Sequence, residues 1–343
     1  MRTYNTAILG ATGAVGQEFI NLIEERNFPF KNLKLLASKR SAGTKMTVNG
    51  KEYVVEEATD DSFKDVEIAL FAGGSISKHF APVAVKSGAV VIDNSSTFRM
   101  DPEVPLIVPE VNPEAIKGHK GIIANPNCST IIMVMALKPL DDAAKMKRIV
   151  VSTYQAVSGG GKEAMAELDE QIHALAEDKP IEPKILPGAS LPKHYQIASN
   201  LIPQIDVFQD NLYTKEEMKM INETRKILSN DGLRVTATTV RVPVYRSHAE
   251  SVNVEFEQPI TVEQAKKAFE AFPGLIVRDN PDEMEYPMPL FTSGKDDVEV
   301  GRIRLDESVE HGLNFWLCGD RIRKGAALNA LQIAEYMIKH DMI

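Results

Sequence analysis

The chain has little cysteine and no long apolar run, and each shortage excludes a class of protein. Only 2 of its 343 residues are cysteine, which excludes a disulfide-stapled framework and predicts a reducing, cytoplasmic compartment. No stretch approaches the roughly 20 apolar residues that a membrane span needs, so no membrane partner is expected. The apolar run near the N-terminus is too short for a signal peptide.

Blocks of like charge are also missing. The formal net charge is −9, from 39 basic and 48 acidic residues spread along the chain, which argues against nucleic acid or an anionic membrane as the main partner. No metal is expected. A hydrophobic content of 43% and a length of 343 residues are typical of a globular protein with room for two domains.

One of the two cysteines stands in the most informative stretch, NPNCST at residues 125–130, directly before an apolar run at 131–137. The proline and asparagines favour a turn, and the following residues favour the start of a helix. A thiol at a helix N-terminus is drawn toward the thiolate, which is the nucleophilic form. For an arbitrary free cysteine an inert, buried role holds about 70% of the time, and the flanking turn lowers this to roughly a third for Cys128.

A glycine-rich turn near the N-terminus predicts a dinucleotide site. Residues 6–9 form a short apolar strand, GATGAVG follows at 10–16, and 17–25 have helical spacing of apolar residues. Strand, glycine turn and helix make the phosphate cradle of a Rossmann unit. The spacing is G-x-x-G-x-x-G, so a chance glycine turn remains about a one-in-five alternative.

The next expected strand, residues 33–38, indicates which dinucleotide is bound. It runs into Ser38-Lys39-Arg40-Ser41 without the carboxylate that holds the ribose of NAD. Hydroxyls and an arginine suit a 2′-phosphate instead, so the sequence favours NADP over NAD. The bland alternative is an exposed basic loop.

Further strand–loop–helix cycles follow at 66–72, 89–93 and 121–124, and Gly74 and Ser75 are expected to line the cofactor. Such alternation is typical of an α/β fold with a doubly wound parallel sheet. Cys128 comes after the last of these strands, at the edge where the nucleotide loops are expected. We therefore infer redox chemistry on a thioester.

The second half supplies polar candidates, each with a bland alternative. Gln155 ends an expected strand and is a polar core residue at about even odds. Glu216 and Lys219 share a helix face, and on an arbitrary helix they would form a solvated ion pair. Arg241 lies on an expected strand at 233–244, and His248 is placed in the loop after it. A lone histidine is structural about two times in three, but a cysteine nucleophile needs such a partner.

These motifs resemble the aspartate-β-semialdehyde dehydrogenase family over nearly the whole chain. The resemblance rests on GATGAVG at 10–16, DNSS at 93–96 with Arg99, NPNCST at 125–130, QAVSG at 155–159, the Glu216–Lys219 and Arg241–His248 pairs, and the segment 319–329. The family reduces aspartyl-β-phosphate to aspartate semialdehyde with NADPH, on the route to lysine (by way of diaminopimelate), methionine and threonine. The resemblance also implies a homodimer in which the second domains share an extended sheet.

The resemblance implies a role for each matching residue. Cys128 would be the nucleophile, His248 the acid–base and Gln155 the residue that orients the thiol. Arg241 and Glu216 would hold the substrate's α-carboxylate and α-amine. The remaining substrate contacts would be Arg99 and Lys219 on the phosphate, and Asn127. Contacts to NADP would come from Thr12, Gly13, Ala14, Val15, Ser38, Arg40, Ser41, Ser158 and Gly159. Gly10 of the glycine turn and Gly74 and Ser75 of the later loop complete the expected cofactor residues. Arg321, which stands where related chains often carry Asn or Gln near the nicotinamide, is the one departure among these cofactor residues.

The expected architecture is a Rossmann-type NADP-binding domain at residues 1–127 and 325–343, and an α+β catalytic and dimerisation domain at 128–324. The first domain is discontinuous because the C-terminal helix at 323–338 is expected to pack back on it. Two alternatives stay open. N-acetyl-γ-glutamyl-phosphate reductase catalyses similar chemistry. The amine of its substrate is acetylated and carries no charge, so Glu216 would have no cation to bind, which disfavours this alternative. The other alternative is a catalytically inactive regulator that binds NADP. Such a protein would not need Cys128, His248, Gln155 and Arg241, and the presence of all four argues against it.

Overall fold

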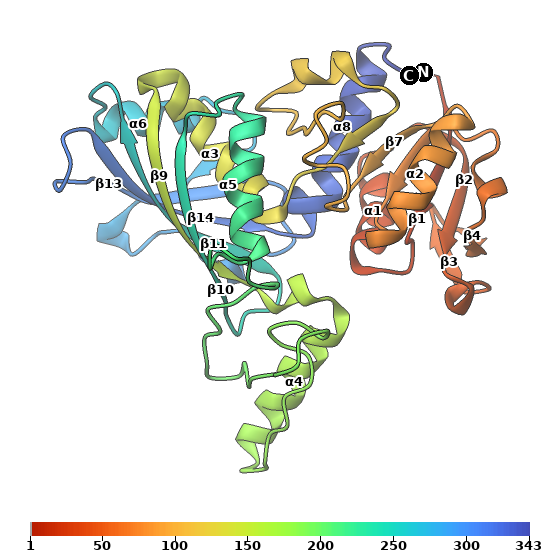
Figure 1. Cartoon of the computed structure of the whole chain (residues 1–343), viewed down its shortest axis with the longest axis horizontal. Helices are drawn as coiled ribbons and strands as arrows, with labels where there is room; N and C mark the ends of the chain where they lie inside the picture. The colour runs from red at the N-terminus through yellow and green to blue at the C-terminus, as the bar shows by residue number, and fades with distance from the viewer. Residues whose placement is uncertain (1) are drawn as a thin grey trace. The chain divides into compact units, whose positions relative to one another are not determined.

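The computed structural model describes residues 2–343, which fold into two compact units (Figure 1). The first unit comprises the chain up to Asn127 together with Gly325–Ile343, and the second comprises Cys128–Lys324. The fold class predicted from the sequence is confirmed, since one unit is a parallel α/β sheet and the other is a mixed α+β sheet. No helix within residues 2–343 has the length and apolar character needed to cross a membrane.

The first unit is built on a six-stranded parallel sheet in the order β5-β2-β1-β6-β7-β8. Its strands are β1 (Tyr4–Leu9), β2 (Phe30–Ala37), β5 (Glu56–Glu57), β6 (Ile68–Phe71), β7 (Val90–Asp93) and β8 (Ile122–Ala124). A separate antiparallel hairpin consists of β3 (Lys45–Val48) and β4 (Lys51–Val54). The helices are α1 (Ala14–Glu25), α2 (Ser77–Lys86) and α8 (Leu328–Lys339), with short 3₁₀ turns at Lys39–Ser41, Asp60–Phe63, Gly74–Ile76 and Pro113–Gly118.

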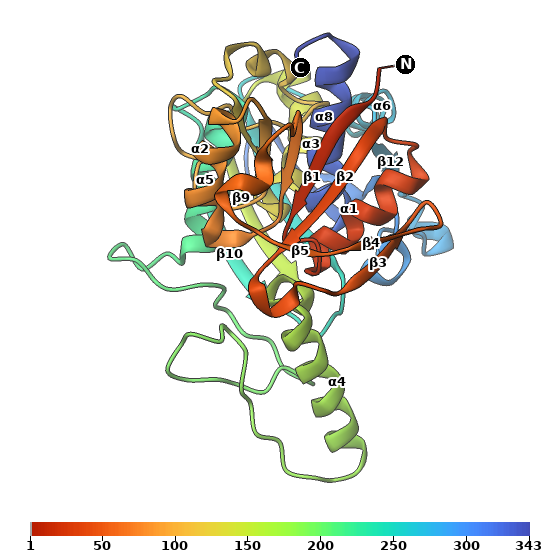
Figure 2. The ribbon, with the colours of Figure 1, turned by 90° about the vertical axis from the view of Figure 1, so that its right-hand side faces the viewer.

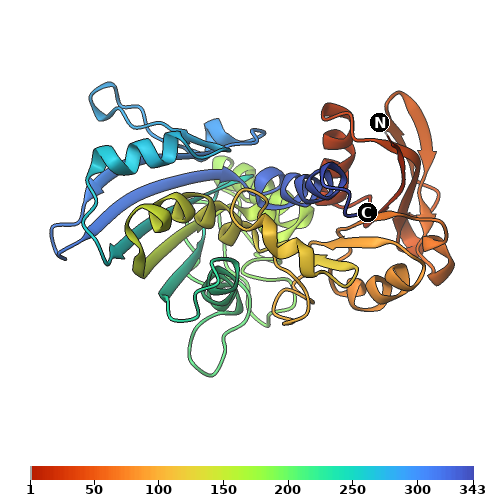
Figure 3. The ribbon, with the colours of Figure 1, turned by 90° about the horizontal axis from the view of Figure 1, so that it is seen from above.

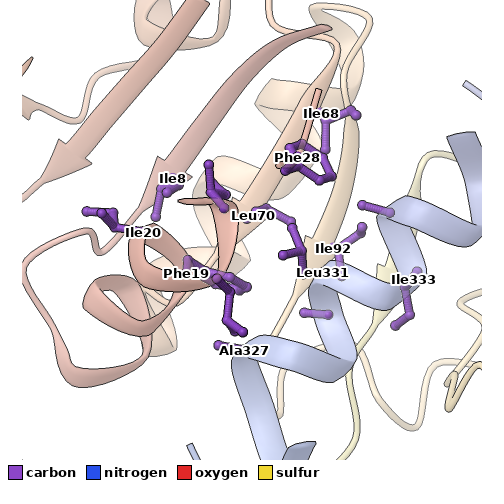
Figure 4. Close-up of a cluster of buried hydrophobic side chains, with 14 of the residues drawn as sticks. Ile8, Phe19, Ile20, Phe28, Ile68, Leu70, Ile92, Ala327, Leu331 and Ile333 are labelled. Atoms are coloured by element: carbon purple, nitrogen blue, oxygen red, sulfur yellow. The ribbon is translucent and has the colours of Figure 1, made fainter. Parts of the chain in front are cut away.

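Alternation along the strands divides the apolar side chains between two helical layers. Ile8 and Leu70 point to the face that Phe19 of α1 and Leu331 of α8 cover (Figure 4). Leu9 and its neighbours on the other face pack with α2, and Figure 2 shows α2 on the opposite side of the sheet from α1 and α8. Burial on both faces is what a parallel sheet requires. It makes the C-terminal helix part of the first unit's core.

The second unit has a mixed six-stranded sheet in the order β10-β9-β11-β14-β13-β12. Its strands are β9 (Met146–Gln155), β10 (Arg234–Arg241), β11 (Ser247–Phe256), β12 (Leu275–Val277), β13 (Val298–Leu305) and β14 (Gly312–Asp320). Its helices are α3 (Cys128–Ala144), α4 (Lys162–Ala176), α5 (Lys215–Ile227), α6 (Val262–Glu270) and α7 (Pro289–Thr292), with 3₁₀ turns at Val157–Gly160 and Pro281–Glu283.

One face of this sheet is covered by helices. Figure 3 shows α3 and α6 along the strands, and α3 contacts β9, β11, β13 and β14. The apolar run after Cys128 is buried on all sides, as expected for a helix between a sheet and other helices. Helix α4 and the segment after it extend away from the sheet (Figures 1 and 2).

Two local expectations need correction. His248 was expected in a loop, but it is the second residue of β11 and pairs with Gly319 of β14. Pro243 redirects the chain early enough for the strand to begin at Ser247. The C-terminal helix was expected from residue 323, but Arg323–Ala327 form a π-helical turn before α8 begins at Leu328. Strand pairing therefore holds the histidine more rigidly than a loop would.

Replacement of Leu331 by alanine tests whether α8 belongs to the core of the first unit. The side chain is fully buried, so L331A should lower the free energy of unfolding by about 2–5 kcal/mol. Urea unfolding followed by circular dichroism measures the change. The matched control is L201A, because Leu201 is 56% exposed and should cost under about 0.5 kcal/mol. Equal costs for the two variants would contradict the packing of α8.

Candidate active site

Cys128 is the first residue of α3, and an asparagine network fixes the turn before it. The Asn125 Nδ2 donates to Asn94 Oδ1 at 2.8 Å, and Asn329 Nδ2 donates to Asn125 Oδ1 at 2.7 Å. The Asn125 backbone N–H donates to the Asp93 carbonyl at 2.8 Å. Three separate chain segments of the first unit thus hold the turn from which α3 begins. The sequence predicted the turn and the helix start.

The thiol of Cys128 faces His248. Its Sγ lies 3.3 Å from His248 Nε2, and the backbone N–H of Ala156 donates to His248 Nδ1 at 3.0 Å. Because Nδ1 accepts a hydrogen bond, a neutral His248 carries its proton on Nε2. That proton is directed at the sulfur, so the imidazole stabilises a thiolate by donating a hydrogen bond to it.

His248 is held in the neutral form. The residue is completely buried, and burial lowers its pKa well below 6.5, with Arg321 and Arg241 lowering it further. An imidazolium is therefore not the resting partner of the cysteine at neutral pH. The charges that lower the pKa of His248 are those of Arg321 and Arg241, and the Cys128 charge acts in turn to raise the pKa of each arginine.

Gln155, Glu216 and Lys219 form one hydrogen-bonded chain in the second unit. Gln155 Nε2 donates to Glu216 Oε1 at 3.2 Å, and Lys219 Nζ donates to Glu216 Oε2 at 3.0 Å. Lys219 also donates to Asp206 Oδ2 at 3.2 Å, and Thr153 Oγ1 donates to Gln155 Oε1 at 3.0 Å. The Glu216–Lys219 pair is thus not a solvated surface pair, because the side chain of Glu216 is only 6% exposed.

Arg241 is a buried cation. Burial lowers its pKa to about 10, against the opposing charges of Glu216 and Cys128, so it stays charged at neutral pH. Its Nη1 donates to the Ala156 carbonyl at 2.6 Å. Gly159 leaves the space for this group, because a Cβ there would lie 2.6 Å from Arg241 Nη1. The sequence predicted Arg241 but not its dependence on Gly159.

The glycine turn of the first unit has the shape of a phosphate cradle. Gly10 has a φ of +84° and a Cβ there would lie 2.7 Å from the Ala72 carbonyl oxygen, while a Cβ at Gly16 would lie 2.2 Å from the Gly10 carbonyl oxygen. Only glycine permits both close approaches. Helix α1 begins directly after Gly13 with no acidic residue in its first turn, which leaves its N-terminus suited to an anion.

The other predicted cofactor residues lie at the ends of elements. Thr12, Ala14 and Val15 are partly exposed around the start of α1, Ser38, Arg40 and Ser41 lie at the turn after β2, and Gly74 and Ser75 are exposed after β6. Ser158 and Gly159 belong to the second unit, in the 3₁₀ turn after β9. The sequence did not indicate that Glu56 and Glu57 of β5 pair with Leu36 and Ala37, which brings two exposed carboxylates beside the end of β2.

Arg99 lies in the first unit, where its Nε donates to the Asn125 carbonyl at 2.9 Å and its Nη2 to the Asn94 carbonyl at 2.9 Å. It therefore ties together the loops after β7 and β8. Asn127 is buried at the end of the same unit.

Comparison with known proteins settles the family. The family model described as "Semialdehyde dehydrogenase, NAD binding domain" matches residues 5–119, and that described as "Semialdehyde dehydrogenase, dimerisation domain" matches 137–324. The aspartate-semialdehyde dehydrogenase of Aquifex aeolicus is 54% identical, with 99% of each chain covered. The chain belongs to the aspartate-semialdehyde dehydrogenase family.

Solved structures of this family have the same fold. The aspartate semialdehyde dehydrogenase II of Vibrio cholerae, "complexed with ASA", has a TM-score of 0.93 and 46% identity, and 99% of each chain is covered. The Candida albicans aspartate semialdehyde dehydrogenase "with NADP" has a TM-score of 0.75 and 26% identity over 100% of both chains. The resemblance seen in the sequence is confirmed, and the protein is an oxidoreductase with an NAD(P)-binding domain.

Two features of the second unit were not predicted from the sequence. The backbone N–H of Ala156 has no side-chain signature at all. Glu250 was treated as part of an ordinary strand, but it is completely buried and burial raises its pKa well above 4.5. Within residues 2–343 no group of three or more His, Cys, Asp or Glu side chains is arranged to hold a metal ion.

Gly159→Ala should weaken substrate binding, because the added methyl group displaces the guanidinium of Arg241. In the α-carboxylate-binding role that the family resemblance implies for Arg241, the loss of this charge-assisted contact predicts a rise in the KM for aspartate semialdehyde of about 10–100-fold. The control is Gly232→Ala, where the nearest atom to the new Cβ is 3.6 Å away. Steady-state kinetics measures both variants, and an unchanged KM in G159A would contradict the steric role of Gly159.

Proposed function

We propose that the chain reduces L-aspartyl-4-phosphate to L-aspartate 4-semialdehyde with NADPH, through a thioacyl intermediate on Cys128. The observation that carries the proposal is the 3.3 Å contact of Cys128 Sγ with an imidazole whose other nitrogen accepts from Ala156. A thiolate with a hydrogen-bond donor beside it is equipped to attack an acyl phosphate and to leave again from a tetrahedral species. The product serves the synthesis of lysine, methionine and threonine.

The residues divide the chemistry as follows. Cys128 forms a carbon–sulfur bond as the carbon–oxygen bond to phosphate breaks, and phosphate takes the negative charge away. NADPH, when bound, supplies the hydride that reduces the thioester. Hydride addition leaves an alkoxide, and we assign the Nε2–H of His248 to this oxygen as its hydrogen-bond donor. The alkoxide becomes the aldehyde as the carbon–sulfur bond breaks and its electron pair returns to Cys128 as thiolate. His248 acts there as acid–base by sharing its Nε2 proton first with the oxygen and then with the sulfur, without becoming an imidazolate.

Substrate recognition rests on the charges of the second unit. We assign Arg241 to the α-carboxylate, since a planar guanidinium binds carboxylates in a bidentate manner. Glu216, oriented by Gln155 and Lys219, is assigned to the α-ammonium group. Lys219, Arg99 and Asn127 are assigned to the phosphate and the remaining polar atoms of the substrate.

The cofactor is proposed to be NADP rather than NAD. The cradle formed by Gly10 and Gly16 fits a pyrophosphate, and Thr12, Gly13, Ala14 and Val15 supply the start of α1. Ser38, Arg40 and Ser41 would hold the 2′-phosphate, and Gly74, Ser75, Ser158 and Gly159 would line the rest. The carboxylates of Glu56 and Glu57 are exposed, so solvent screens their repulsion of that phosphate.

A homodimer is proposed through the second unit, in the reducing cytoplasm that suits two cysteines outside any disulfide. The face of the sheet that helices do not cover carries half-buried side chains, among them Tyr154 and Trp316, whose ring centroids lie 5.2 Å apart. Aromatic surfaces of this kind are enriched at subunit interfaces. Sedimentation should give twice the mass of the chain.

The direct test of the function is the oxidative reaction with aspartate semialdehyde, inorganic phosphate and NADP or NAD, followed by nicotinamide absorbance. Phosphate-dependent reduction of NADP is expected, and a thiol alkylator should abolish it. Arg40→Ala should raise the KM for NADP about tenfold or more while that for NAD stays unchanged. Turnover with NAD but not with NADP would overturn the cofactor assignment. No turnover with either cofactor would overturn the proposed function.

Cys128→Ser should abolish phosphate-dependent turnover, because a serine hydroxyl is a far weaker nucleophile than a thiolate. The variant should still bind NADP, which fluorescence titration measures. Near-normal turnover in C128S would rule out the thioester route.

His248→Ala should lower turnover roughly 10²–10⁴-fold, since it removes the proton donor of the tetrahedral species. Single-turnover kinetics measures the chemical step directly. A loss below tenfold would remove His248 from the acid–base role.

A further inference from the structure

Arg321 is a charged residue to which the proposed mechanism assigns no role in substrate binding. It comes one residue after β14, where the side chain of Asp320 fixes the turn by accepting from Ile322 N at 2.8 Å and Arg323 N at 3.0 Å. In the sheet, Gly319 pairs with His248 and Asp320 with Ser247. The register therefore brings Arg321 to the end of the strand pair that carries the catalytic histidine.

The same strand end lies close to the helix that begins with Cys128. A Cβ at Gly319 would lie 2.9 Å from Ile132 Cγ1 of α3, so the backbone of β14 approaches the second turn of that helix. The Nε of Arg321 is enclosed and has no hydrogen-bond acceptor among residues 2–343, while the side chain as a whole is half-buried. The strand end that precedes Arg321 therefore lies between the strand of His248 and the first turns of α3, and the Arg321 Nε has no hydrogen-bonding partner there among the described residues.

The electrostatics agree with this placement. Burial lowers the pKa of Arg321, and Cys128 is the largest influence that opposes the lowering. Arg321 is also the largest charge effect that lowers the pKa of His248. The titratable or charged groups of the second unit that interact electrostatically with Arg321, or with the groups that it influences, are Cys128, His248, Arg241, Glu216, Asp320 and Arg246.

We infer that Arg321 is the countercharge that keeps Cys128 as a thiolate beside a neutral His248, and so acts as a positioning residue for the nucleophile. A reactive cysteine needs a nearby cation or donor, and an imidazolium often supplies it. Here the Ala156 N–H occupies Nδ1 and two arginines oppose protonation of the ring. Arg241 is assigned to the substrate's carboxylate. When substrate is bound, Arg321 is therefore the one of these two arginines that remains to stabilise the thiolate. The inference rests on the proposed function only in taking Cys128 as the nucleophile.

The test is the rate of alkylation of Cys128 in the full-length protein without substrate, measured from pH 5 to 10 with neutral iodoacetamide and anionic iodoacetate. Arg321→Gln should slow alkylation by iodoacetamide at pH 7 about tenfold and move the midpoint of the profile to higher pH. It should also lower the ratio of the iodoacetate rate to the iodoacetamide rate. Arg321→Lys should retain much of both properties, because it keeps the charge.

The matched control is Lys267→Gln, which removes one exposed positive charge on α6 and should leave both alkylation readouts unchanged. A folded R321Q protein, with wild-type circular dichroism, whose profile and rate ratio match the wild type would overturn the inference. If R321Q does not fold, nitrogen NMR of the wild type at pH 7 tests the inference instead, because it reports the protonation state and tautomer of the His248 ring. A neutral ring with its proton on Nε2 supports the inference, and an imidazolium overturns it.

These readouts are independent of the reaction itself. Loss of the phosphate-dependent assay with an intact alkylation profile would contradict the proposed function and leave the role of Arg321 standing. Normal phosphate-dependent turnover of the wild type, with the same alkylation profile in R321Q as in the wild type, would support the proposed function and contradict the role of Arg321.

Discussion

A single peptide residue, Ala156, organises the catalytic groups of the second unit. Its N–H donates to His248 Nδ1 at 3.0 Å, and its carbonyl accepts from Arg241 Nη1 at 2.6 Å. The N–H sets the tautomer of His248, and the carbonyl sets the direction of the Arg241 guanidinium. Because both belong to the same residue, a shift of the chain at the end of β9 would misplace histidine and arginine together.

The chain around Ala156 is correspondingly well anchored. Val242 N donates to the Gln155 carbonyl at 3.0 Å, and Val157 N donates to the Val244 carbonyl at 2.8 Å. These bonds continue the parallel pairing of β9 with β10 past the point where β10 ends. A site built on strand ends is held more precisely than one built on free loops. The glycine at position 159 belongs to the same design, since it leaves room for the arginine.

The sequence was sufficient to predict features that depend on residues close together in the chain. The NPNCST turn, the glycine cradle and the arginine–histidine pair each have recognisable residues at fixed spacing, and the structure brings Cys128, His248, Gln155, Glu216 and Arg241 into one unit. Features that arise from pairing between distant segments could not be predicted. The pairing of β5 with β2, the strand position of His248 and the backbone donor at Ala156 all depend on register, which leaves no local mark.

The covalent intermediate on Cys128 is the central claim, and mass spectrometry of the protein tests it most directly. The enzyme is mixed with aspartate semialdehyde and NADP in the absence of phosphate, quenched in acid and digested. The expected result is an aspartyl thioester on the peptide that contains Cys128, which disappears when phosphate is added before the quench. An unmodified Cys128 peptide under conditions that reduce NADP would contradict the thioacyl mechanism.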